Sequence, residues 1–240
     1  MFFVFAMGVV CFLMQAGFGL LEAGSVRAKN AQNIMLKNVM DAVITAWAYF
    51  LFGYSVAYGA DGGKFIGGSS LLALRADKVS SVDFLYWFFN CTLSSPSVLC
   101  VYLLPVLLTH LFRIFCPPTD VFAGTTATIV SGAVAERCQF RAYLVYSFVL
   151  AGFIYPVASH WIWDSNGFLN GKVYDFAGGG AVHAVGGIAA ATGSYILGPR
   201  KGKFIIDDET GKKKPVDIPG HNMVLAALGT MILWFGFFAL

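Results

Sequence analysis

The sequence predicts an all-α, polytopic membrane protein, and three observations support this prediction. Hydrophobic residues make up 58% of the 240-residue chain and charged residues only 12%, about half the charged share of a typical soluble domain. Several apolar runs approach the roughly 20 residues that an α-helix needs to cross a bilayer. A spanning segment must also bond its own backbone polar groups in lipid, which favours helices.

Six apolar runs are long enough, or nearly long enough, to cross the membrane. They lie at residues 1–23, 39–58, 98–115, 142–163, 175–198 and 221–240. A further half-buried stretch at 121–135 ends at Glu136-Arg137. Most Lys and Arg residues lie in segments that would be on the same side of the membrane if the N-terminus faces outward. This distribution predicts a cytoplasmic 198–219 loop, provided that 83–135 crosses the membrane an odd number of times.

Residues 91–120 differ from the sequence on either side of them. The stretch is rich in Ser, Pro and Leu, and it contains Pro105 and the pair Pro117-Pro118. Proline removes a backbone donor and kinks or breaks a helix. The composition of the segments on either side of 91–120 is that of one continuous helix. We therefore predict a single transmembrane domain over 1–240, with 91–120 as an insertion that interrupts its third helix.

The sequence offers no pattern for enzymatic, metal-binding or nucleic-acid-binding chemistry. The five cysteines are scattered without a C-x-x-C spacing, so we interpret them as apolar packing residues. No nucleophile–base pair or phosphate-binding loop stands out. We expect a protein that is not an enzyme, needs no cofactor or metal and binds no nucleic acid.

The segment Asp175–Gly187 places a carboxylate and an imidazole in an apolar, small-residue stretch. Ionisable groups at membrane depth are costly and commonly mark a substrate or ion pathway. His183 follows Asp175 by eight residues, or about 12 Å of helical rise, too far for a direct hydrogen bond. We interpret Asp175 as a helix N-cap, with an electrostatic role toward a cation as the alternative. His183 is either a bonded core histidine or a pore-lining group for a small polar solute or a proton.

Aromatic residues form a second group of candidates. Trp161 and Trp163 end the predicted 142–163 span, while Phe122 and Phe237 lie in or near other spans. Tryptophans at such positions commonly form a membrane-interface belt, which is our interpretation of Trp161. The same rings can attract a small ammonium-type cation through cation–π interaction. For Trp163 both interpretations stay open.

Several motifs together resemble the ammonium transporter family (the Amt/Mep/Rh superfamily), in particular its eukaryotic and plant-like Amt branch. The matching segments are Gln15–Asn30, Thr128–Arg137, Tyr155–Trp163, Asp175–Gly187 and Trp234–Phe237. Apart from 91–120, this resemblance covers nearly the whole chain. It implies about six helices, the N-terminal half of an eleven-helix fold built as two inverted halves.

The resemblance also implies roles for particular residues. Trp163 and Phe122 match the groups that recruit the ammonium ion, and Phe89 matches an additional vestibule aromatic if 91–120 is removed. Phe122 and Phe237 match the stacked pair that closes the pore entrance. Asp175 matches a buried aspartate near the recruitment site. His183 matches the first of two pore histidines.

The implied function is passage of ammonium or ammonia through a hydrophobic pore after the ion is recruited and deprotonated. The family implies a homotrimer in the lipid bilayer, with the plasma membrane as the expected location. Its second half and second pore histidine would lie beyond Leu240, so we expect the 240-residue chain alone not to conduct. The alternative is a truncated, non-transporting ammonium sensor or regulatory partner of full-length transporters.

Overall fold

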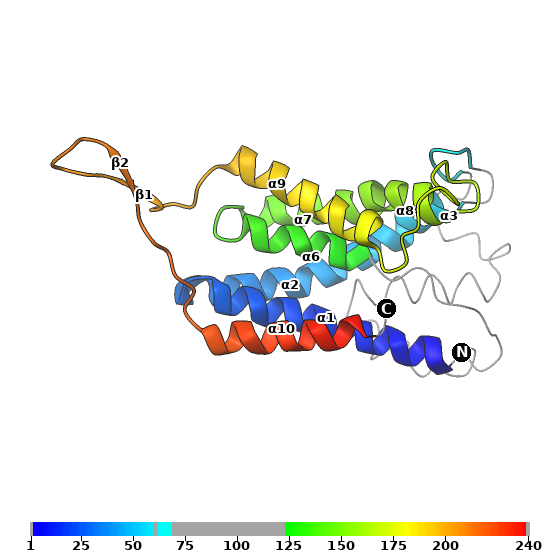
Figure 1. Ribbon diagram of the computed structural model, residues 1–240, viewed down its shortest axis with the longest axis horizontal. Coiled ribbons are helices and arrows are strands. Elements are labelled where there is room, and N and C mark those ends of the chain that lie inside the picture. Colours follow the sequence, from blue (N-terminus) through cyan, green and yellow to red (C-terminus); the bar gives the residue numbers. More distant parts are fainter. Residues whose placement is uncertain (1, 60–61, 69–122, 239–240) are drawn as a thin grey trace.

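The computed structural model describes residues 2–59, 62–68 and 123–238. Its helices lie side by side along one long axis (Figure 1). The helical elements are α1 (Phe2–Ser25), α2 (Ala28–Ala48), η1 (Tyr49–Gly53), α3 (Tyr54–Tyr58), α6 (Ala123–Val134), α7 (Phe140–Val149), η2 (Leu150–Ile154), α8 (Tyr155–Trp163), η3 (Gly179–Ala184), α9 (Val185–Leu197) and α10 (Met223–Phe237). The η segments are π-helical turns that continue the α-helices beside them.

Within these described ranges, three helical runs are long and apolar enough to cross a membrane. They are Ala28–Tyr58, Phe140–Trp163 and Gly179–Leu197, with 31, 24 and 19 residues. The helices Ala123–Val134 and Met223–Phe237 are shorter and also apolar. The predicted helical, multi-pass architecture is confirmed. The run predicted at 98–115 lies outside the described residues, as does the predicted insertion at 91–120.

The second helical run begins at Ala28, earlier than the predicted residue 39. Its first turns are polar, yet several of their side chains are buried against neighbouring helices. Lys37 donates from Nζ to the carbonyl oxygen of Cys138 at 3.0 Å and lies 5.3 Å from the centre of the Tyr143 ring. Partners of this kind offset the desolvation cost of a buried charge. The polar sequence therefore continues the helix instead of forming a loop.

Helices α1 and α10 pack along each other although they stand at opposite ends of the sequence (Figure 1). Their backbones approach closely at Gly17, where a Cβ would lie 2.8 Å from Cγ of Leu233 and 2.9 Å from its backbone nitrogen. Helices α6 and α9 meet at Gly186, where a Cβ would lie 3.0 Å from the Thr126 carbonyl oxygen. Small residues at such crossings let membrane helices make extensive van der Waals contact.

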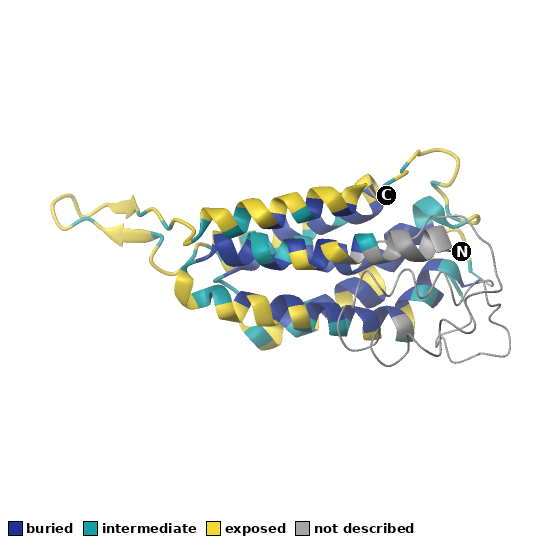
Figure 2. Cartoon of the chain, turned by 90° about the horizontal axis from the view of Figure 1, so that it is seen from below, coloured by how far each residue is buried: buried dark blue, intermediate teal, exposed yellow. Residues whose placement is uncertain are grey.

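Buried positions gather on the facing sides of the helices, and exposed positions on their outer sides (Figure 2). Many of the exposed side chains are large and apolar, among them Trp47, Phe153, Ile188, Tyr195, Met231 and Trp234. A water-soluble protein rarely exposes so much contiguous apolar surface. This outer surface fits contact with lipid.

The loop between α9 and α10 forms a two-stranded antiparallel hairpin that projects beyond the helix ends (Figure 1). Strand β1 (Phe204–Ile206) pairs with β2 (Lys213–Pro215), and Ile205 lies opposite Lys214. Both strands are exposed over their whole length. The sequence analysis predicted a polar loop here and no strands.

Candidate functional site

The candidate site begins where α8 ends. Trp163, the last residue of α8, donates from its indole Nε1 to the Asp175 carbonyl oxygen at 2.7 Å. The indole is partly buried and packs against a core cluster that includes Tyr155 and Ala181. The bond ties the end of α8 to the segment before η3. It thereby fixes Trp163 beside the start of the helix that carries His183.

Asp175 holds the first turn of η3 through its side chain. Its Oδ2 accepts hydrogen bonds from the backbone N–H groups of Gly180 and Ala181, each at 2.9 Å. Charge-assisted bonds of this type satisfy donors that a helix start leaves free. Gly180 permits the approach, because a Cβ there would lie 3.2 Å from Asp175 Oδ2. Asp175 thus bonds the first turn through its side chain, but it does not occupy the N-cap position predicted for it, which belongs to Gly178.

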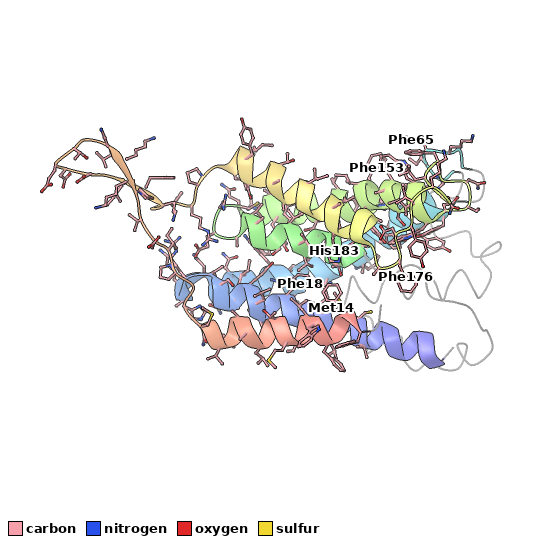
Figure 3. All side chains as sticks on the ribbon, viewed as in Figure 1. Met14, Phe18, Phe65, Phe153, Phe176 and His183 are labelled. Carbon is pink, nitrogen blue, oxygen red and sulfur yellow. The ribbon has the colours of Figure 1, made fainter. Side chains whose placement is uncertain are left out.

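His183 lies in the π-helical part of this element. Its backbone N–H bonds to the carbonyl of Gly178, five residues earlier, at 3.0 Å. Gly178 has a φ of 80°, in the left-handed region that glycine adopts readily. Single π-helical turns occur frequently at functional sites because they turn side chains out of the regular helical register. In Figure 3 His183 lies at the level of Met14 and Phe18 of α1.

The imidazole of His183 faces the aromatic ring of Phe237 near the end of α10. Their ring centres lie 5.7 Å apart with an angle of 31° between the planes. The His183 side chain is half-buried, and Phe237 is 41% exposed. Residues 54 positions apart are thus in contact. A neutral imidazole at this place can donate or accept a hydrogen bond with a small polar solute.

The remaining predicted residues divide into two groups. Phe122 and Phe89 lie outside the described residues. Trp161 packs its ring 5.0 Å from that of Phe65 and donates to the Phe65 carbonyl at 2.8 Å. It anchors a loop at the end of the bundle, and its place at the membrane interface stays a prediction. The structure therefore makes two direct contacts among the predicted residues, Trp163 with Asp175 and His183 with Phe237. Asp175 is linked to the element that carries His183 through the backbone of Gly180 and Ala181, and Trp161 stands apart.

Two further contacts at this site escaped the sequence analysis. His160, fully buried, places its Nδ1 2.6 Å from the Ala57 carbonyl oxygen and its Nε2 2.9 Å from that of Gly63. These contacts hold α3 and the loop that follows it against α8. Both of its partners are backbone carbonyl groups about 100 residues away in sequence, which a pattern does not reveal.

The opposite end of the bundle is held by Glu136, between α6 and α7. Its Oε1 accepts hydrogen bonds from Arg27 Nε at 3.0 Å and from Asn30 Nδ2 at 2.6 Å, and its Oε2 lies 3.4 Å from Arg200 Nη1. Burial by itself raises the pKa of Glu136, but the bonds from Asn30 and Arg27 outweigh it and hold the pKa below its ordinary value. As a carboxylate, Glu136 therefore holds together the connecting segments that follow α1, α6 and α9.

The fold and the site define a class: a helical membrane protein with aromatic, imidazole and carboxylate groups between its helices. The chain belongs to the Ammonium Transporter Family, whose sequence model matches residues 1–99 and 112–240. It is 44% identical to ammonium transporter 1 member 3 of Solanum lycopersicum over 95% of this chain and 44% of that protein. It is 40% identical to ammonium transporter Amt2 of Archaeoglobus fulgidus over 98% of this chain and 46% of that protein.

Solved structures agree with this assignment. A structure described as a sensor Amt protein matches 99% of this chain and 52% of its own length, with a TM-score of 0.76 and 29% identity. Mep2 of Candida albicans matches 99% of this chain and 46% of its own length, with a TM-score of 0.71 and 27% identity. The chain spans about half the length of the relatives it matches. The predicted fold, half of the ammonium transporter architecture, is confirmed.

Proposed function

We propose that this chain forms half of a transmembrane pathway for ammonium or ammonia. Family membership supports transport of this substrate class, since the named relatives are ammonium transporters rather than enzymes. The observation that carries the proposal for this chain is the contact between His183 and Phe237, whose ring centres lie 5.7 Å apart. It brings an imidazole from one helix and an apolar ring from another to one point inside the bundle.

In the proposed mechanism, Trp163, Phe122 and Phe89 attract the ammonium ion through cation–π interaction. The Asp175 carboxylate contributes negative charge nearby, and its bonds to Gly180 and Ala181 keep it in place. The ion then gives up its proton, since a full charge is far costlier than neutral ammonia in an apolar passage. Ammonia passes Phe237, which acts as a gate, and accepts or donates a hydrogen bond at His183.

Methylammonium uptake in cells that lack their own ammonium transporters tests this proposal. The gene encoding this chain is expressed at its full length, and surface expression is measured for every variant. We expect uptake in the unmodified protein and its loss in His183→Ala. The matched control is His221→Ala, which removes an exposed imidazole whose Nδ1 bonds to the Val26 carbonyl at 3.0 Å. Normal surface expression without uptake above background would contradict the proposal.

We further propose that the assembled protein is a homotrimer in the plasma membrane. The apolar outer surface of the described helices supports contact with lipid and with other copies of the chain. Crosslinking in native membranes followed by sizing tests the assembly, because only a trimer would give a ladder that ends at three copies.

A second candidate is a non-transporting ammonium sensor or a regulatory partner of longer transporters. One observation favours it: one matched structure is described as a sensor Amt protein. Co-expression with a full-length transporter separates the candidates. A regulatory partner would change the uptake of that transporter without adding uptake of its own.

A further inference from the structure

His160 lies where the last turns of two helices meet. It stands in the last turn of α8, and its ring reaches across to α3 and to the loop that follows α3. Nδ1 lies 2.6 Å from the Ala57 carbonyl oxygen, and Nε2 lies 2.9 Å from the Gly63 carbonyl oxygen. Each ring nitrogen therefore has a backbone carbonyl oxygen at hydrogen-bond distance.

Both of these oxygens can only accept a hydrogen bond. A neutral imidazole has one N–H group and one nitrogen with a lone pair, whereas an imidazolium has two N–H groups. In either neutral form of His160, one nitrogen would turn its lone pair toward a carbonyl oxygen at 2.6 or 2.9 Å. Bulk water does not reach the ring to supply a donor, since the residue is 0% exposed. Only the doubly protonated ring satisfies both contacts.

The surroundings of His160 also favour a positive charge. The peptide dipoles of a helix leave partial negative charge at its C-terminal end, which stabilises a cation there. His160 lies in the last turn of α8, and Ala57 lies in the last turn of the continuous helical run Ala28–Tyr58. The Asp164 carboxylate adds a full negative charge, with its Oδ1 3.8 Å from His160 Nδ1. Two helix ends and a carboxylate therefore surround the ring.

Asp164 is the acidic side chain among the described residues of α3, α8 and the loops that follow them. Its side chain is 14% exposed, so water screens its charge only in part. The other titratable groups on the described segments packed against α8 are Tyr49, Tyr54, Tyr58, Lys64, Lys172 and His183. The two lysines are exposed, and water therefore screens their positive charges. The tyrosines are neutral as phenols.

The residues on either side of His160 fasten the same part of the chain through uncharged contacts. Ser159 Oγ lies 2.8 Å from the Tyr58 hydroxyl oxygen, and Trp161 Nε1 donates to the Phe65 carbonyl oxygen at 2.8 Å. His160 is the central link of this series and the one that can carry a charge. Loss of either ring proton would break the series in its middle.

We propose that His160 is held as an imidazolium, with a proton on both ring nitrogens, and that this charged clamp positions the end of α8 that carries Trp163. The positioning role rests on the proposed transport function, in which Trp163 helps to recruit the ion. His160 acts through the segment that it holds, so it is a positioning residue. The imidazolium and the Asp164 carboxylate together form a pair without net charge.

Solid-state 15N NMR of the chain in lipid bilayers tests the protonation state directly. Histidine labelled at both ring nitrogens is incorporated, and the His160 signals are identified by their absence in His160→Gln. We expect both nitrogens of His160 to show a directly bonded proton at neutral pH. Asp164→Asn identifies the same signals without altering His160, because it removes the charge beside this ring and should lower the share of the doubly protonated form. A His160 ring with one unprotonated nitrogen at neutral pH would overturn the inference.

The indole N–H signal of Trp163 measures the positioning role, since this group donates to the Asp175 carbonyl oxygen at 2.7 Å. We expect Asp164→Asn to shift this signal, because fewer rings then hold both carbonyl oxygens. A purely steric role of His160 would not respond to this change of charge. The matched control is Ser159→Ala, which removes the uncharged contact with Tyr58 and should keep both N–H signals of His160.

An unchanged Trp163 signal in Asp164→Asn would overturn the positioning role, as would loss of a His160 N–H signal in Ser159→Ala. Methylammonium uptake by the full-length protein is a separate measurement. Uptake by a protein whose His160 carries a single ring proton would overturn only this inference. A doubly protonated His160 in a protein without uptake would overturn only the transport proposal.

Discussion

Replacement of Asp175 by Ala should loosen the start of η3 and displace His183. The substitution removes both hydrogen bonds that Oδ2 accepts, from Gly180 and Ala181 at 2.9 Å each. Loss of a side chain that caps a helix start costs about 1 kcal/mol, and up to about 2 kcal/mol in well-packed proteins. The part-buried N–H of Ala181, left without its partner, adds to this cost. We therefore expect a loss of about 2–3 kcal/mol, equivalent to roughly 30–150-fold in the local equilibrium.

Asp175→Asn separates the geometry from the charge. Both bonds end on the same oxygen, so an amide oxygen can accept them both without the negative charge. We expect Asn to lose about 1 kcal/mol or less, because the bonds persist but are no longer charge-assisted. Thermal unfolding of the purified proteins in one detergent, followed by tryptophan fluorescence, measures both effects. Stability of Asp175→Ala equal to the unmodified protein, or equal losses for Ala and Asn, would refute the capping argument.

Two further predictions concern helix packing and pH. Gly186→Ala should destabilise the protein by about 1–3 kcal/mol through overpacking against the Thr126 carbonyl, whereas Gly187→Ala, with no atom within 4 Å of its Cβ, should be neutral or slightly stabilising in the same thermal assay. Because the pKa of Glu136 lies below its ordinary value of 4.5 in the folded protein, the unfolded chain takes up a proton first as the pH falls. The stability difference between the unmodified protein and Glu136→Gln should therefore be constant above pH 4.5 and shrink as the pH falls through the folded pKa. A difference that stays unchanged below that pKa would show that the charge of Glu136 contributes no stability.

The sequence predicted the positions of the helices best where the residues along a helix are mostly apolar. The run expected at 142–163 is observed at Phe140–Trp163, and that expected at 221–240 contains α10 at Met223–Phe237. The sequence analysis began the second helical run at residue 39 and so missed its first part, 28–38. This error has a physical cause. A hydropathy pattern counts Lys37 and Asn38 as polar wherever they stand, but Cys138, Tyr143 and Glu22 bond or cover them inside the bundle. Such partners are distant in sequence and become visible only after folding.

The same distinction applies to the helix starts. That Asp175 bonds the start of the next helix was expected from an acidic residue before an apolar run, which is local information, but the N-cap position itself belongs to Gly178. The N-cap of α10 is Asn222, whose side-chain oxygen accepts from Leu225 N–H at 3.0 Å. From its position before the last apolar run, His221 was expected to cap this helix. That expectation is wrong, since His221 Nδ1 instead lies 3.0 Å from the Val26 carbonyl oxygen, 195 residues away in sequence.

The sequence by itself determined the membrane class, the family resemblance and the residue types at the candidate site, because these depend on composition and on short motifs. Only the tertiary structure brought His183 to Phe237, with their ring centres 5.7 Å apart. The reason is that α1 and α10, from opposite ends of the sequence, pack together through small residues. The distances between functional groups follow from that packing, and no local pattern in the chain encodes them.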